Sequence, residues 1–139
     1  MARLFWIVIG FLLGVLSAGL STMVLYLWFF SPIRIVERVL GWDLPRNISV
    51  ISRCDDRDGF FGQGSTLTIF LLPTNYTETI LRACPSGFKR GTLEQSGIPE
   101  RDSGILADAA VCFLTKEDLS RQDTIVFAKE KLLHLRIDR

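Results

Sequence analysis

The chain has 139 residues, of which 48% are hydrophobic and 22% are charged, so it has room for one small domain beside an apolar segment. This length excludes a large or multidomain enzyme. The 16 Lys and Arg against 15 Asp and Glu give a formal charge of +1, which creates no field to attract nucleic acid, so no nucleic-acid partner is predicted.

The first predicted element is a transmembrane helix. Residues 4–30 contain no charged residue and no Pro, Asn or Gln. As a helix these 27 residues are about 40 Å long, enough to cross a hydrocarbon core of about 30 Å. Trp6 near one end, and Tyr26 with Trp28 near the other, match the two aromatic belts of a membrane span. A cleaved signal peptide has an apolar region of only about 7–15 residues, so we interpret residues 1–30 as a retained anchor.

Small residues recur every four positions within this segment, at Gly10, Gly14, Ala18 and Thr22. This spacing places them on one side of a helix, where another helix can approach closely. The pattern predicts packing against a transmembrane partner or a second copy of the chain. The alternative is that it reflects the ordinary composition of membrane helices.

Residues 31–46 form a connector. Ser31 is a predicted N-cap, Pro32 suits the first helical position, and an amphipathic helix should follow as far as Leu40. This helix lies either at the membrane surface, with Trp42 at the interface, or against the soluble domain.

Residues 47–139 predict an α+β domain with an antiparallel sheet and one or two short helices. Alternating apolar residues indicate strands at Ile48 and Val50, at Leu67, Ile69 and Leu71, at Ile125 and Phe127, and at Leu133, Leu135 and Ile137. The apolar run 110–114 is either a strand or the end of a helix.

The remaining elements of the domain are two predicted helices and a loop. One helix should begin near Asn75, with the Asn75 side chain as its cap and Glu78 at the third position. A second, very short helix is expected at residues 115–118. The segment 86–104 is rich in Gly, Ser, Pro and charge, which predicts a long exposed loop.

Three cysteines, Cys54, Cys84 and Cys112, allow at most one intramolecular disulfide. Each is equally well explained as a small buried hydrophobic residue. Because the chain has no CxxC motif or Cys/His cluster, no metal or cofactor is predicted.

The densest polar motif contains Asp55, Asp56 and Asp58, followed by Gly59. Asp and Gly favour a hairpin turn with solvated carboxylates. The alternative is a calcium-binding turn, but the helices and the twelfth-position Glu of an EF-hand are missing.

Catalytic residues are not predicted. The single histidine, His134, lies between two leucines on an expected strand, and no nucleophile stands at a diagnostic spacing from it. We expect a structural histidine and a protein that is not an enzyme.

Residues 55–72 resemble a hairpin in small, uncharacterised bacterial membrane-anchored or lipoprotein-type envelope proteins, which carry an Asp-x-His-Gly-Gly-Phe-His-Gly-Asp-Gly segment. The C-terminal Asp138-Arg139 pair also resembles the end of their closing hairpin. This chain departs from them in having no His in the loop. The resemblance implies a β-rich fold and an envelope location, without any activity.

The orientation of the anchor has two opposing indications. Arg34, Arg38 and Arg46 outnumber Arg3, and this count favours a cytoplasmic C-terminal domain. The short N-terminal tail and the resemblance favour the opposite, and we therefore expect an extracytoplasmic domain.

Together these features predict a non-enzymatic single-pass membrane protein. It would be an accessory subunit or a small regulatory or immunity-type binder that docks to a membrane partner through its anchor. The alternative is an envelope domain that senses a ligand or calcium, and a hydrolase ranks third.

Overall fold

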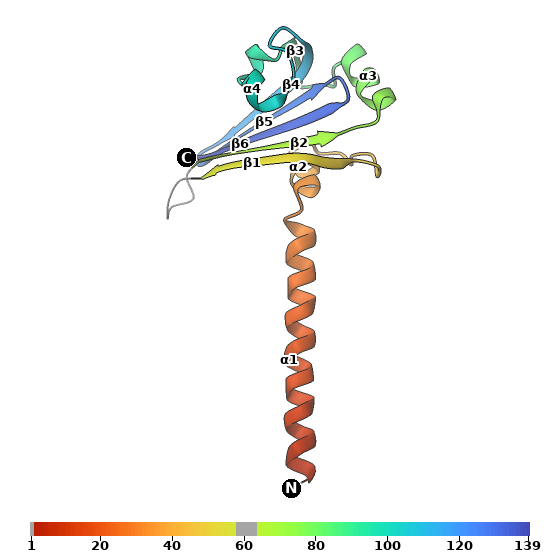
Figure 1. The fold of residues 1–139 in the computed structure, drawn as a ribbon, viewed down its shortest axis with the longest axis vertical. Helices are drawn as coiled ribbons and strands as arrows, with labels where there is room; N and C mark the ends of the chain where they lie inside the picture. The colour runs from red at the N-terminus through yellow and green to blue at the C-terminus, as the bar shows by residue number, and fades with distance from the viewer. Residues whose placement is uncertain (1, 58–63) are drawn as a thin grey trace. The chain divides into compact units, whose positions relative to one another are not determined.

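The computed structural model describes residues 2–57 and 64–139, which fall into two compact units, 1–38 and 39–139. The first unit contains α1 (Ala2–Phe29) and most of α2 (Pro32–Leu40), whose last two residues belong to the second unit. The second unit carries the sheet and the other short helices (Figure 1). The predicted α+β class, with a long apolar helix before an antiparallel sheet, is confirmed.

Helix α1 is uninterrupted because no proline lies between Ala2 and Phe29. It ends before Ser31-Pro32, where α2 begins. The Ser31 Oγ accepts a hydrogen bond from the Arg34 amide at 3.3 Å, as expected of an N-cap. Among the described residues, Trp6–Phe29 is the one helical segment long and apolar enough to cross a membrane.

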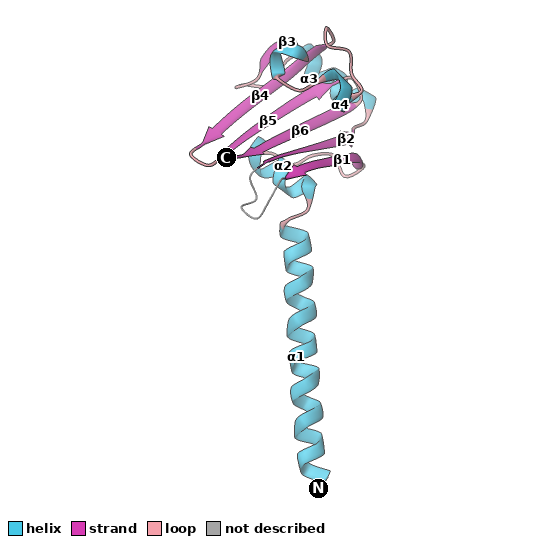
Figure 2. Cartoon of the chain, turned by 60° about the vertical axis from the view of Figure 1, so that its left-hand side comes forward, coloured by secondary structure: helices cyan, strands magenta, loops and turns pink. Residues whose placement is uncertain are grey.

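Six antiparallel strands form one sheet in the order β1-β2-β6-β5-β4-β3 (Figure 2). Their bounds are β1 Ser49–Arg57, β2 Gly64–Leu71, β3 Lys89–Thr92, β4 Ala110–Asp118, β5 Arg121–Ala128 and β6 Lys131–Asp138. The strands expected from alternation are therefore present, and the run 110–114 belongs to a strand. β5 and β6 occupy the centre, and β1 and β3 form the two edges.

Between the strands lie α3 (Thr74–Arg82), the 3-10 turn η1 (Glu94–Ser96) and α4 (Glu100–Ser103). The expected cap at Asn75 is wrong: α3 begins one residue earlier after Pro73, and the Asn75 Oδ1 accepts a hydrogen bond from the Tyr76 amide. The expected loop 86–104 contains β3, η1 and α4. The Lys-Arg-Gly-Thr sequence of β3 has no apolar alternation, so pairing with β4 is what makes it a strand.

The short helix expected at 115–118 is also wrong, since this segment completes β4. Its polar side chains lie opposite polar residues of β5, with Lys116 facing Asp123 and Asp118 facing Arg121. Such opposite-charge pairs stabilise neighbouring strands. The pairing with β5 overrides the local preference of this sequence for a helix start.

Both faces of the sheet are covered at one end of the strands. One face packs against the η1 segment in a cluster of Leu67, Ile69, Leu93, Ile98, Val111, Val126, Ala128 and Leu133. On the other face, Trp42 contacts Phe88 at 5.9 Å between ring centroids, and Phe88 contacts Phe127 at 5.6 Å. Val39 and Leu40, the last two residues of α2, are also buried.

Helix α3 is fixed to the turn between β5 and β6. Glu130 in this turn has a φ of 60°, which non-glycine residues rarely adopt. Its amide donates to the Thr77 hydroxyl at 3.2 Å, and its carbonyl accepts from the Leu72 amide at 3.0 Å. These bonds hold the turn and the start of α3 together.

A disulfide links Cys84, just after α3, to Cys112 in β4, whereas Cys54 is a free, exposed thiol. The bridge joins residues separated by 28 positions. A crosslink of this length restricts the unfolded chain by about 3 kcal/mol in the chain-entropy model. The one disulfide that the cysteine count allows therefore stabilises the packing of α3 on the sheet.

We predict that replacing Cys84 and Cys112 together by Ala lowers the melting temperature of the full chain by about 15 °C. Thermal unfolding followed by circular dichroism measures this change. Cys54→Ser is the matched control and should melt like the parent, because Cys54 is exposed and unbridged. Equal melting of the double variant and the parent would show that the bridge does not stabilise the domain.

Candidate functional site

The C-terminal end of α1 carries two arginine–aromatic contacts. The Arg34 guanidinium lies 4.9 Å from the ring centroid of Trp28, and that of Arg38 lies 4.1 Å from the ring of Phe29. Arg38 also donates to the Phe29 carbonyl, which is one of the carbonyls left unpaired where the helix ends. A positive charge is favourable here because helix C-termini carry partial negative charge. Aromatic rings with cations beyond them match the chemistry of a membrane–water boundary.

The predicted interface residues separate into two groups. Trp6, Tyr26 and Trp28 are exposed on α1. Trp42 lies in the second unit, where its ring packs against Phe88. The membrane-interface location of these four residues stays a prediction.

The small-residue stripe on α1 is uncovered. A side chain added at Gly10 or Gly14 would meet no atom within 4 Å. The Thr22 hydroxyl donates to the Ala18 carbonyl at 2.7 Å, so it is satisfied within its own helix. The stripe therefore offers a shallow groove in which shape, rather than hydrogen bonding, determines what fits.

Two carboxylates of the predicted turn, those of Asp55 and Asp56, lie in a strand. Asp55 and Asp56 are neighbours in β1, and successive strand residues face opposite sides of the sheet. Asp55 accepts a hydrogen bond from the Thr66 hydroxyl at 3.0 Å. Asp58 lies outside the described residues. Within residues 2–57 and 64–139, no group of three or more His, Cys, Asp or Glu is placed to hold a metal ion.

Asp56 lines a pocket of about 350 Å³ on the face that packs against η1. Leu67, Leu135 and Ile137 provide its apolar wall, and Asp102 of α4 also lines it. The free Cys54 is also part of its lining. The pocket thus opens beside the edge strand β1.

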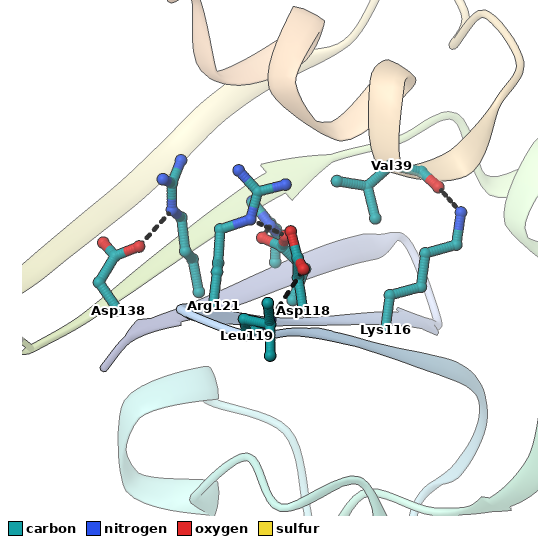
Figure 3. A network of polar contacts seen from close by, with 9 residues as sticks. Val39, Lys116, Asp118, Leu119, Arg121 and Asp138 are labelled. Atoms are coloured by element: carbon teal, nitrogen blue, oxygen red, sulfur yellow. Dashed lines mark hydrogen bonds and ion pairs between the residues drawn. The ribbon is translucent and has the colours of Figure 1, made fainter.

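The centre of the sheet holds a buried polar pair, Asp123 and His134. Nε2 of His134 lies 2.8 Å from Oδ1 of Asp123, and Nε of Arg121 donates to Oδ2 of the same carboxylate at 2.7 Å. Asp123 is 4% exposed and His134 is 5% exposed. A general base must reach the proton that it removes, and this burial instead favours a structural role for the pair. Figure 3 shows the surrounding contacts, including Lys116, which donates to the Val39 carbonyl at the end of α2.

Asp123 has a lowered pKa as the net result of opposing effects. Burial raises the pKa of this carboxyl, but the hydrogen bond from His134 and the charges of His134, Arg121 and Arg136 lower it further than burial raises it. A carboxyl whose pKa falls on folding stabilises the fold above its ordinary pKa. That contribution is lost as the pH falls through the folded-state value.

This pair belongs to a row of polar side chains that crosses five strands on one face. In strand order the row contains Asp55, Thr66, Arg136, Asp123 and Lys116, each directly opposite the next. Apart from the threonine, positive and negative residues alternate along it. Each cross-strand pair of opposite charge favours this register over a shifted one.

Asp123, Arg121 and Arg136 were not among the residues predicted from the sequence, although His134 was expected on a strand. A signal was present: both strands of this hairpin alternate charged residues on one face, as Arg121 and Asp123 in one and Arg136 and Asp138 in the other. Paired by the two-residue turn, these sets become neighbours. Arg34 and Arg38 of α2 were predicted only as charged residues after the anchor, not as partners of the rings at the end of α1.

Comparison with known proteins found no matching family model, no matching curated protein and no matching solved structure.

We predict that Asp123→Asn destabilises the domain by about 2 kcal/mol at neutral pH, because hydrogen bonds to a charged group are lost. As the pH is lowered below about 4, the unfolding free energy of the parent should also decrease, and the variant should lack this part of the decrease. Denaturant unfolding at several pH values measures both effects. Asp108→Asn, at an exposed position, is the control and should retain the acid-dependent decline. If Asp123→Asn followed the pH profile of the parent, the carboxylate would have no stabilising role.

Proposed function

We propose that this chain is a non-enzymatic single-pass membrane protein, an accessory subunit or small regulatory or immunity-type binder. In this proposal α1 docks to a membrane partner, and the sheet domain is presented on the extracytoplasmic side. The observation that carries the proposal is the end of α1. An exposed apolar helix of membrane-spanning length finishes there in aromatic rings covered by Arg34 and Arg38.

The physical reason is solvation. Side chains such as Phe11, Leu12 and Leu16 are each more than half exposed on α1. A contiguous apolar surface of this extent is unfavourable in water and favourable in lipid. At the end of the helix, the guanidinium groups can remain in the headgroup layer while the rings occupy the boundary.

The docking surface in this proposal is the stripe of Gly10, Gly14 and Ala18. Lipid tails are as apolar as leucine, so helices associate in a membrane mainly through close van der Waals packing. The absence of any atom near the added positions at Gly10 and Gly14 means that a second helix can approach the α1 backbone there.

We predict that Gly10→Leu with Gly14→Leu reduces association with the membrane partner by about tenfold, while the amount of membrane-inserted protein is unchanged. The added side chains fill the groove but keep the helix apolar. Recovery of partners with the tagged full chain in mild detergent, beside quantification of the membrane fraction, measures both quantities.

Leu12→Ile with Leu16→Ile is the matched control, since it changes side-chain shape away from the stripe and should have little effect. If the Gly-to-Leu variant recovered the same partners at the same level, α1 would serve only as an anchor.

The proposed orientation is supported by the Cys84–Cys112 disulfide, because such bonds persist in oxidising compartments. We predict that alkaline phosphatase fused after Arg139 is active in intact bacterial cells, and that the fusion retains α1 by intact mass. An inactive fusion, in cells where an exported control is active, would place the domain in the cytoplasm. A fusion that lost its first residues by cleavage would identify α1 as a signal sequence.

A further inference from the structure

The two edge strands of the sheet, β1 and β3, differ in length and in how far their outer sides are covered. β3 has four residues, and the Gln95 side chain of η1 accepts a hydrogen bond from the Thr92 amide at 3.1 Å. β1 has nine residues, and every residue from Ser49 to Asp56 is exposed. Within the described residues no strand pairs with the outer side of β1. A long uncovered edge is a template for pairing with another strand.

The regular part of this edge begins after a bulge. The register with β2 shifts between Val50 and Ser52, which bends the strand and interrupts regular pairing at that point. From Ser52 onward β1 continues in regular register with β2. An added strand would therefore pair most favourably along residues 52–56.

We propose that the occupant of this edge is a second copy of the chain, whose β1 pairs antiparallel with β1 across a two-fold axis at Cys54. Two identical strands that extend one continuous sheet must place residues of the same face opposite each other. The axis must therefore pass through a residue position, so only a few registers are available.

Charge selects among these registers. An axis at Arg53 places Arg53 opposite its own copy, and an axis at Asp55 does the same for Asp55, so each juxtaposes like charges. An axis at Cys54 places Arg53 opposite Asp55 of the second copy, and Asp55 opposite its Arg53. In the single chain these two side chains form a loose ion pair at 3.9 Å along the strand. The proposed register thus adds two cross-strand pairs of opposite charge.

The same register extends the charged row of the sheet. Asp55 terminates the row that passes through Thr66 and Arg136, and an arginine of the second copy would follow it. Cys54 lies on the opposite face and would meet its own copy at the axis. Directly opposed residues have Cα atoms about 4.5–5.5 Å apart, which is within the range that a disulfide spans. Cys54 is therefore a reporter of the register as well as a member of the interface.

The test is oxidative crosslinking of the full chain in mild detergent, with copper phenanthroline and a non-reducing gel. We expect the parent to form a reducible Cys54-linked dimer. Arg53→Asp and Asp55→Arg each place two like-charge pairs across the axis, so each should slow crosslinking by about tenfold. Because Asp55→Arg also removes the bond from Thr66, melting of each variant is measured beforehand; Arg53→Asp leaves that bond in place.

Two complementary combinations provide the matched controls. The double variant Arg53→Asp with Asp55→Arg restores opposite charges and should crosslink like the parent. A mixture of the two single variants should form mixed dimers in preference to dimers of either variant alone. Crosslinking that was equally fast in all of these samples would overturn the proposal, since it would then arise from collision or from another contact.

The register has its own control. In a Cys54→Ser background, Ser52→Cys should not link to its own copy, because in the proposed register the two sites are about 13 Å apart along the strand. A mixture of Ser52→Cys and Asp56→Cys in that background should crosslink. Self-linking of the Ser52→Cys variant would contradict the axis at Cys54.

This inference does not depend on the docking assigned to α1. Gly10→Leu with Gly14→Leu should leave the charge dependence of the Cys54 crosslink unchanged. If that variant lost partner recovery but kept the charge-dependent crosslink, the two surfaces would be separate. If instead partner recovery were normal and the crosslinking rate did not depend on the charges at positions 53 and 55, only the proposed β1 interface would be overturned.

Discussion

The buried carboxylate of Asp123 is the constraint on which the arrangement of the sheet depends. A charge removed from water is tolerated only when hydrogen bonds and opposite charges replace the lost hydration. Arg121 and His134 provide these from β5 and β6. A shift of one residue between the two strands would carry His134 to the other face and leave the carboxylate without this partner. β5 and β6 are the central strands, and β4 and β2 pair with their outer sides.

The same sheet shows which parts of a fold can be predicted from local sequence. Leu67, Ile69 and Leu71 alternate with polar residues in β2, and a half-buried strand imposes that period on the sequence. α1 is equally recognisable, because an apolar segment of its length has few other structural interpretations. β3 could not be predicted in this way, since its four residues form a strand only because β4 lies beside them. The polar residues 115–118 resemble a helix start when taken alone, whereas their partners lie across the hairpin in β5.

The candidate sites also differ in whether they consist of residues close in sequence or of distant residues brought together by the fold. The stripe at Gly10 and Gly14 can be identified from spacing alone, because a helix fixes the geometry of residues four positions apart. Trp6 and Trp28 can be identified from their places at the two ends of the apolar segment. The pair formed by Asp123 and His134 depends on the register of two strands. The choice of Cys84 and Cys112 as disulfide partners depends on the packing of α3 on the sheet, which three cysteines in a sequence do not determine. Contacts between distant residues require the tertiary structure.

The two proposed association surfaces use different physical interactions because they face different solvents. In lipid there is no hydrophobic gain from bringing two apolar helices together, so the glycine groove of α1 can discriminate between partners only by closeness of fit. At the aqueous edge of the sheet, main-chain groups of β1 provide affinity for any extended strand and cannot by themselves choose one. Discrimination there must come from side chains, and exposed ion pairs are individually weak. The order Arg53-Cys54-Asp55 compensates for this weakness, because a two-fold axis at Cys54 forms the Arg53–Asp55 pair twice, whereas the neighbouring registers place like charges opposite each other. If two such chains shared one bilayer, as the proposed function implies, their confinement would raise their effective concentration, and weak but register-specific pairing would then suffice for association.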